Sequence, residues 1–291
     1  MPDEEETPRS GKMHPRNALN DLTGSQWVWF LNSIWLTNTV RTGDKSHAYD
    51  LRKEHPSPKP PHLLAELIEF FTKRGGRVLD PFAGVGSTLM ACSLCQRCGY
   101  GIELSQQYID VYRQICEREP DKYRAMPLYL GDARNIGEMP EVLVNAPYNL
   151  ILTDPPYSDM LSRPRTKQAG GDATPFTLDT NDLGNIECVS DQNPPYAPFL
   201  KELNAILTSA SALLVKGGHI VVFCKDFQPT AEYHNLLHAD LVSDLSNIPG
   251  MRYRGMRIWA NMTQKLYPLG YPYAFVANQI QQYILIFRKE V

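Results

Sequence analysis

The stretch RVLDPFAGVGSTLMACSL at 77–94 constrains the fold of this chain more than any other. Apolar residues at its start predict a buried strand, Gly84 and Gly86 predict a tight turn, and the residues from Ser87 onward predict a helix. A strand that leads through a glycine turn into a helix is the opening of a β-α-β unit. Such units build a parallel sheet with helices on both faces.

The rest of the chain continues this alternation. Strands are expected at 99–104, 127–136, 148–157, 219–227, 256–262 and 282–289, and helices at 62–76, 105–119 and 197–218. The last two strands have no helix between them, so we expect an antiparallel hairpin at the edge of the sheet. The predicted fold class is α/β, a doubly wound, mostly parallel sheet with an antiparallel C-terminal hairpin.

The N-terminal region is interpreted in two parts. Residues 1–19 are polar and charged and are expected to be a flexible arm, whereas 20–291 are expected to form a single domain with a long polar loop at 158–195. Thr23 is expected to cap a helix. The helix is rich in tryptophan, and Trp27, Trp29 and Trp35 are interpreted as a lid or packing face in preference to a base-stacking platform.

Composition limits the class of protein. A net charge of −3 over 291 residues does not by itself indicate a nucleic-acid partner, so any basic surface must be local. No apolar run is long enough to span a membrane, and the N-terminal residues do not resemble a secretion signal. Six cysteines in a chain of this length do not suggest a disulfide scaffold. We therefore expect a cytoplasmic protein that does not associate with membranes.

A nucleotide-type pocket is predicted where successive strands end. Gly84 and Gly86 let backbone approach a ligand, and the sequence lacks the Gly-Lys-Ser/Thr of a phosphate-binding loop. Glu103 ends the second strand about 20 residues later, where an acid can hold both ribose hydroxyls. Asp132 ends the third strand and can reach an adenine amino group. A single feature of this kind is weak evidence for a ligand site, but three such features at successive strand ends favour one.

Together, D-P-F-A-G-V-G at 80–86, G-Y-G-I-E-L at 99–104 and D-P-P-Y at 154–157 resemble the S-adenosylmethionine-dependent amino-methyltransferases of DNA. The resemblance implies a Rossmann-like methyltransferase fold and S-adenosylmethionine as the cofactor. The cofactor contacts that it implies are Asp80, Phe82, Gly84, Gly86, Glu103 and Asp132, joined by Pro58, Lys59 and Pro60 from the segment that precedes the first of these motifs. Many family members place the tetrapeptide before the cofactor turn and carry a large target-recognition domain between them. Here the order is reversed and no insertion is that long. The part that recognises the target sequence is therefore expected to be short, or to be supplied by a protein partner or a second copy of the chain.

Two copies of Pro-Pro-Tyr compete for the catalytic role. In the first copy, the Asp154 carboxylate and the Pro155 carbonyl can accept the two protons of an exocyclic amine, which frees its lone pair. Pro155 and Pro156 lack backbone N–H groups, and Tyr157 offers a face on which the base can stack. A strand precedes Asp154, whereas the residues before Asn193, which opens the second copy at 193–196, are loop-like. We therefore assign catalysis to Asp154, Pro155, Pro156 and Tyr157 and interpret the second copy as a lead-in to a helix.

Two short basic segments are expected on the catalytic side as contacts for DNA phosphates, in preference to solvated loops. They comprise Arg163, Arg165 and Lys167, and Arg252, Arg254 and Arg257. Cys92, Cys95 and Cys98 have an iron–sulfur-like spacing but are interpreted as ordinary helix residues, and no metal is expected.

The sequence thus predicts transfer of a methyl group to an exocyclic amine of a flipped DNA base, with adenine N6 favoured. Three alternatives stay open: cytosine N4 methylation of DNA, guanine N2 methylation of RNA, and an inactive nucleic-acid-binding partner. RNA is the less favoured substrate because no appended RNA-binding domain is visible.

Overall fold

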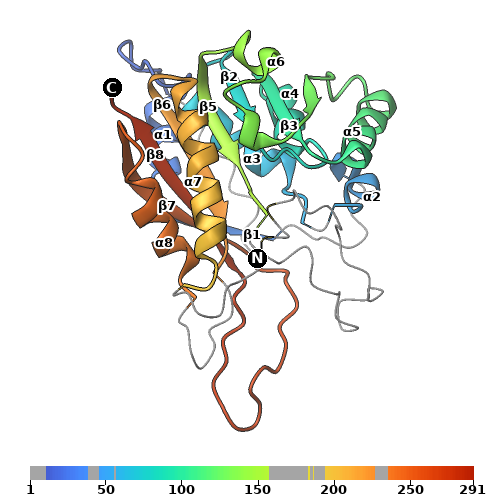
Figure 1. Cartoon of the computed structure of the whole chain (residues 1–291), viewed down its shortest axis with the longest axis vertical. Helices are drawn as coiled ribbons and strands as arrows, with labels where there is room; N and C mark the ends of the chain where they lie inside the picture. Colours follow the sequence, from blue (N-terminus) through green and yellow to red (C-terminus); the bar gives the residue numbers. More distant parts are fainter. Residues whose placement is uncertain are drawn as a thin grey trace.

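A computed structural model describes residues 11–38, 46–55, 57–156, 183, 186, 194–226 and 235–291. Within these ranges the centre of the molecule is an eight-stranded sheet in the order β1-β7-β8-β6-β5-β2-β3-β4 (Figure 1). Its strands are β1 (Ile34–Thr37), β2 (Arg77–Asp80), β3 (Cys98–Glu103), β4 (Leu128–Leu130), β5 (Tyr148–Thr153), β6 (Leu214–Cys224), β7 (Met251–Asn261) and β8 (Gln281–Lys289). The doubly wound α/β prediction is confirmed.

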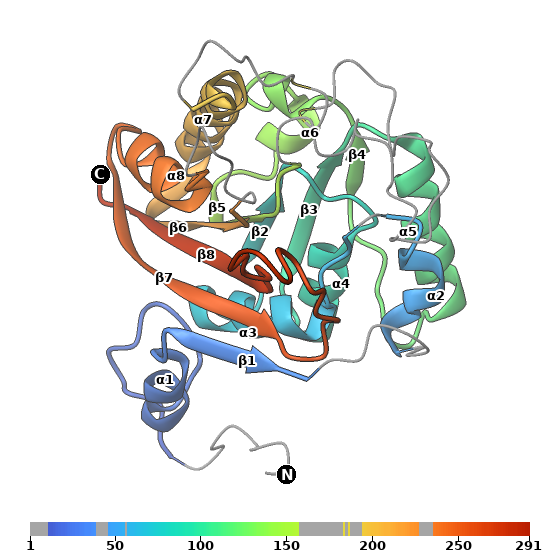
Figure 2. The ribbon, with the colours of Figure 1, turned by 90° about the horizontal axis from the view of Figure 1, so that it is seen from below.

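Helices cover both faces of the sheet (Figure 2). They are α1 (Gly24–Phe30), α2 (Tyr49–Arg52), α3 (Pro61–Phe71), α4 (Ser87–Leu94), α5 (Gln106–Arg118), α6 (Pro140–Leu143), α7 (Ala197–Ala212) and α8 (Leu237–Leu245), with 3-10 turns η1 (Ser46–Ala48) and η2 (Ala133–Asn135). None of the helices in the described ranges is long and apolar enough to cross a membrane.

Strand alternation divides the core in two. Val78, Leu150 and Leu152 face a cluster formed with α3, α4 and α5, whereas Leu79 and Ile151 face a second cluster formed with α7 and α8. Both faces of the central strands are therefore buried, which is why these strands appear in the sequence as continuous apolar runs.

The C-terminal strands correct one prediction. β8 is antiparallel to both β6 and β7, so the expected hairpin forms. It does not form the edge, because β1 pairs in parallel with β7 and lies outside it. No strand was expected at β1, which follows α1 after only three residues. The predicted cap at Thr23 is confirmed, since its side chain accepts the backbone N–H of Gln26 in a capping box.

Part of the expected flexible arm is packed against the domain. Met13 forms a β-bridge with Thr23, and the Asn17 side chain binds that of Asn20 at 2.7 Å. Asn20 is fully buried and donates to the Phe70 carbonyl at the end of α3. Residues 11–19 therefore belong to the folded part of the chain, and residues 1–10 lie outside the described ranges.

Strand direction defines two edges that matter for the sites of this molecule. β2, β3, β5, β6 and β7 all run the same way, so they end at one edge, here called the carboxyl edge, and begin at the other, the amino edge. In open α/β sheets ligands bind outside the carboxyl ends of the strands.

Candidate active site

The Asp80 carboxylate organises the turn after β2. Its Oδ1 accepts the backbone N–H of Phe82 at 3.1 Å and the Thr153 hydroxyl at 2.8 Å, and its Oδ2 accepts the Thr88 hydroxyl at 2.6 Å. Burial raises the pKa of Asp80 to about 6, against the lowering effect of these hydrogen bonds. Asp80 thus ties the ends of β2 and β5 to α4, and it also lines the pocket beside this turn.

Gly84 and Gly86 are both left-handed, with φ of 52° and 75°. A Cβ on Gly86 would lie 2.2 Å from Tyr112 Cδ2, so packing against α5 alone already requires glycine there. A Cβ on Gly84 would lie 3.1 Å from His55 Nε2. Gly84 is therefore the position at which the turn faces the pocket.

The acids after β3 and β4 lie at the carboxyl edge as predicted. Glu103 accepts the Gly84 N–H at 2.7 Å with Oε2 and the Ser105 N–H at 2.8 Å with Oε1. Asp132 accepts the Arg134 N–H at 2.9 Å and forms an ion pair with its guanidinium. Each carboxylate oxygen has a further lone pair, so both acids retain the capacity to accept a hydroxyl or amine donor.

The Asp154 side chain meets a lysine from a distant segment. Asp154 comes directly after β5, and its Oδ2 forms an ion pair with Nζ of Lys59. The lysine side chain is 7% exposed and the aspartate 21%. Lys59 also lies over the Phe223 ring, 5.4 Å from its centroid, and its carbonyl accepts Arg52 at 2.7 Å. The segment 58–60, expected at the cofactor, therefore reaches the predicted catalytic acid.

The same segment closes the pocket. Only about 30 Å³ of free cavity remains between the turn after β2 and the end of β5. It is lined by residues that include His55, Pro58, Lys59, Asp80, Phe82, Gly84 and Asp154. His55 was not expected at this site, although it lies only three residues before Pro58. Burial lowers the pKa of His55 to about 4, so its ring is neutral and can accept as well as donate.

Two further side chains at the carboxyl edge were missed. Asp226, two residues beyond β6, is buried and accepts the His238 backbone N–H at 2.9 Å. Its carboxylate also contacts His238 Nδ1 at 2.7 Å, and the imidazole stacks on Tyr283 with centroids 4.0 Å apart. An acid close behind a strand was the signal used for Glu103 and Asp132, and it would have indicated Asp226 too.

The predicted basic contacts are placed differently from the expectation. Arg252 and Arg254 lie near the start of β7, at the amino edge and not on the catalytic side. Arg257 is 4% exposed, with its guanidinium 4.2 Å from the Phe30 ring centroid and 4.3 Å from that of Trp35. Its burial within the core corrects the expectation of a surface phosphate contact. Tyr157, Arg163, Arg165, Lys167 and Asn193 lie outside the described residues.

The second tetrapeptide leads into a helix, as its sequence context predicts. Tyr196 is 1% exposed, immediately precedes α7, and donates its hydroxyl to Asp240 on α8. Its role is packing between the two helices.

The cysteine motif is split between elements. Cys92 lies on α4 and Cys95 at its end, whereas Cys98 begins β3, so the three are not all helix residues as expected. All three are free thiols. No group of His, Cys, Asp or Glu among the described residues has the arrangement of a metal site.

Part of the chain is similar in sequence to known proteins. The model of a family described as DNA methylase matches residues 5–114. Type II methyltransferase M.BglII of Bacillus subtilis is 30% identical over 116 residues, which cover 40% of this chain and 31% of the relative. Type II methyltransferase M.HpaI of Haemophilus parainfluenzae is 35% identical over 102 residues, which cover 35% of this chain and 30% of the relative.

Among solved structures, TrmN from Thermus thermophilus aligns with a TM-score of 0.46 and 18% identity, over 79% of this chain and 48% of that one. The chain spans less than a third of the length of the two curated relatives. The matched segment contains the turn at 80–86, the acid at 103 and the segment around Lys59. This segment carries the similarity to DNA methylases and to type II methyltransferases, in agreement with the resemblance to S-adenosylmethionine-dependent DNA amino-methyltransferases.

Proposed function

We propose that this protein transfers the methyl group of S-adenosylmethionine to an exocyclic amine of a DNA base, with adenine N6 as the favoured acceptor. The observation that carries the proposal is the position of Asp154. This carboxylate directly follows β5, and the Asp80–Thr153 hydrogen bond fixes the end of β5 beside the glycine turn. The Asp154 carboxylate and the glycine turn proposed to bind the cofactor are thus held side by side.

The residues around Gly84 suit the cofactor of this family. S-adenosylmethionine carries an adenosine and, when bound, supplies a methyl group on a positively charged sulfur. Glu103 provides carboxylate oxygens for ribose hydroxyls beside a backbone without a Cβ at Gly84. Because the free cavity is small, binding requires His55 and its neighbours to withdraw from Gly84.

The chemistry expected of Asp154 follows from the electronic structure of the amine. The nitrogen lone pair of adenine N6 is delocalised into the ring, so the amine is a poor nucleophile. An acceptor on each of its protons favours a pyramidal nitrogen whose lone pair is free to attack. The Asp154 carboxylate can serve as one acceptor and the Pro155 carbonyl as the other, and neither proline has an N–H to compete.

The loop between β7 and β8 adds a feature suited to a nucleic-acid substrate. It projects from the carboxyl edge (Figure 1) and exposes Tyr271, Tyr273 and Phe275, which are 80%, 94% and 94% accessible. Exposed aromatic side chains of this kind can stack on bases. Their position on the same edge as Asp154 supports a substrate that is nucleic acid.

The choice of adenine rests on resemblance. In this family, aspartate before Pro-Pro-Tyr more often accompanies methylation of adenine, whereas serine at that position more often accompanies methylation of cytosine. The test is to incubate the protein with isotopically labelled S-adenosylmethionine and DNA of mixed sequence, digest the DNA, and identify the methylated nucleoside by mass spectrometry. We expect N6-methyladenine with the wild-type protein and none with the Asp154→Ala protein. N4-methylcytosine as the sole product would overturn the choice of base. Label in RNA alone, or no label above the Asp154→Ala background, would overturn the proposed function.

A further inference from the structure

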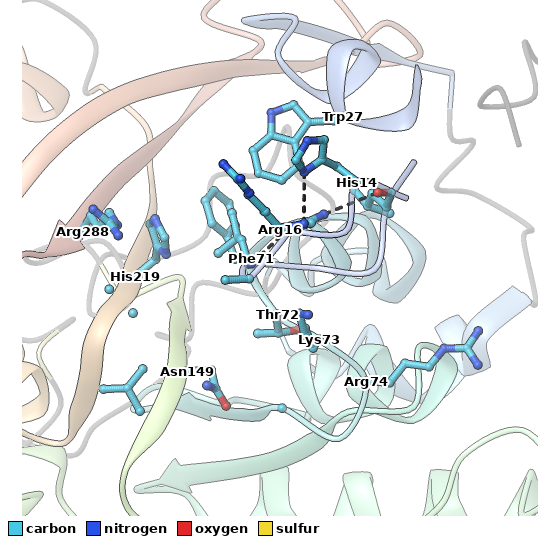
Figure 3. Close-up of a pocket in the computed structure, with 18 of the residues that line it drawn as sticks. His14, Arg16, Trp27, Phe71, Thr72, Lys73, Arg74, Asn149, His219 and Arg288 are labelled. Atoms are coloured by element: carbon cyan, nitrogen blue, oxygen red, sulfur yellow. Dashed lines mark hydrogen bonds between the residues drawn. The ribbon is translucent and has the colours of Figure 1, made fainter. Parts of the chain in front are cut away.

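A large basic cleft lies at the amino edge, the edge of the sheet opposite to the one at which Asp154 lies. Figure 3 shows residues that line it. Its volume is about 1200 Å³. The cationic side chains that line it are Arg16, Lys73, Arg74, Lys216, Arg254 and Arg288. The imidazoles of His14 and His219 line it as well. None of the described residues that line this amino-edge cleft carries a carboxylate. Such a concentration is unexpected in a chain of net charge −3.

Two lysine-glycine segments line the cleft. Residues 73–76, Lys-Arg-Gly-Gly, lead into β2, and residues 216–218, Lys-Gly-Gly, lie near the start of β6, with β5 between these strands. Gly75 and Gly217 have φ of 73° and 83°. A Cβ on Gly75 would meet nothing within 4 Å, so the backbone beside Arg74 is open to a ligand.

Neighbouring acids neutralise only part of this charge. Glu290 forms ion pairs with Arg254 and Arg288. Asp21 accepts the backbone N–H of Arg74 at 2.7 Å, not its guanidinium. Within the described part of the chain, no ion pair is formed by the exposed side chains of Arg16, Lys73, Arg74 and Lys216.

Apolar side chains, among them an indole, also line the cleft. They are Leu19, Leu22, Trp27, Val28 and Phe71. The Trp27 ring packs at a tilt against Phe70, with centroids 5.0 Å apart, and is only partly buried. The cleft therefore combines cations for phosphate with an aromatic surface for a base.

We propose that the amino-edge cleft binds the sugar-phosphate backbone of DNA, as a second nucleic-acid surface separate from the site of methyl transfer. The four unneutralised cations come from three segments along an open cleft, instead of converging on one point. The cleft is also larger than the roughly 300–1000 Å³ of pockets that enclose small ligands. An extended polyanion fits this arrangement better than a single nucleotide does. The choice of DNA as the polyanion rests on the proposed function, whereas the arrangement of cations does not.

The test is the salt dependence of DNA binding by the cofactor-free protein, measured with a fluorescent duplex. Lys73→Gln, Arg74→Gln and Lys216→Gln are combined in one variant. Removal of one cation from a duplex phosphate should lower the log–log slope by about 0.9, so removal of all three predicts a decrease of about 2.7. The matched control combines Arg113→Gln, Arg124→Gln and Lys201→Gln, which are exposed and do not line the cleft. It should keep the wild-type slope. Equal slopes for wild type and cleft variant, or equal decreases in both variants, would overturn the proposal.

Hydrogen exchange locates the DNA-binding surface. DNA should slow exchange at amides in 73–76 and 215–218, in the wild type and equally in Asp154→Ala protein. Protection confined to the carboxyl edge would contradict a second surface. Neither measurement needs turnover. The proposal of a DNA-binding cleft can therefore be refuted while the proposal of DNA methylation stands, and the reverse is also possible.

Discussion

Lys59 and Asp154 form a largely buried ion pair that joins the segment before α3 to the end of β5. Lys59 thereby holds the orientation of the carboxylate proposed to accept the target amine. The lysine is the more buried partner and is fixed from behind by the hydrogen bond between Arg52 and its carbonyl. Removal of either partner leaves a charge in a poorly solvated place, which is costlier than the pair itself.

Lys59→Met should lower kcat at least about tenfold, because Asp154 is then no longer held in orientation, an effect comparable to removing one hydrogen bond to a charged group. Lys59→Arg preserves the charge and should restore part of the rate. Steady-state kinetics with saturating cofactor measure this, and the melting temperature of each variant separates misfolding from misorientation. A rise in kcat for Lys59→Met would show that the lysine blocks Asp154 instead of supporting it.

Asp154→Ala should reduce turnover by about 10²–10³, the range for removing one preorganised group that stabilises a transition state. Cofactor affinity should change little, since the carboxylate serves the target base. Tyr196→Phe in the second Pro-Pro-Tyr is the matched control. It removes the hydroxyl that donates to Asp240 and should reduce stability without reducing kcat. The opposite ranking of the two variants would refute the assignment of the catalytic copy.

Glu103→Gln should weaken S-adenosylmethionine binding about tenfold or more, corresponding to about 1.5–3 kcal/mol for hydrogen bonds to a charged group. The amide oxygen can still accept one of the two backbone N–H groups that Glu103 holds, so the turn should keep its shape. Titration calorimetry with the cofactor gives the affinity directly. Asp110→Asn, an exposed acid on α5, serves as the control. Unchanged affinity for Glu103→Gln would exclude it from the cofactor site.

Gly84→Ala should destabilise the protein by about 1–3 kcal/mol, since alanine disfavours a φ of 52° and its Cβ would press on His55. In the double variant with His55→Ala the steric part should disappear and only the backbone part should remain. Urea denaturation of the two single variants and the double variant forms a complete cycle. Strict additivity would mean that His55 does not rest on Gly84.

His219 should make stability depend on pH. Burial, aided by Arg288 and Arg254, lowers the pKa of His219 to about 4 from the usual 6.5. Between these values the unfolded chain binds the proton more readily, so the free energy of unfolding falls as the pH is lowered from about 6.5 to 4. His219→Phe removes this dependence, and the wild type should lose up to about 3 kcal/mol relative to the variant over that range. Urea titrations at several pH values test it, and a constant difference between the two proteins would argue against a buried neutral imidazole.

The sequence was most informative where structure is local. The central strands are apolar runs because both of their faces are buried, and the Thr23 cap depends only on a residue three positions away. β1 was missed because four residues next to a tryptophan-rich helix carry little signal of their own. Its strand conformation depends on pairing with β7, as between Ile34 and Ile258, far along the chain.

The same division applies to the site. Strand ends placed Glu103, Asp132 and Asp154 on one edge, because parallel strands end together. Which group each oxygen binds depends on the folded chain, so neither the partner of Asp154 nor the internal role of Asp80 could be derived. Arg257 was misassigned for a related reason: a charged residue between surface-like neighbours gives no sign that two aromatic rings from α1 and β1 enclose it.

The position of β8 between β6 and β7 has a consequence for the order of assembly. β7 reaches the rest of the sheet only through β8, and β1 only through β7, so the first strand of the fold cannot dock until the eighth has been synthesised. The glycine turn after β2 and the end of β5 need no such delay, because β2, β3, β4 and β5 pair among themselves. During synthesis on the ribosome, the carboxyl edge around Gly84 can therefore take shape while the walls of the amino-edge cleft that come from α1, β7 and β8 are still apart. Closure of the sheet by strands so distant in sequence is expected to be the slow phase of folding.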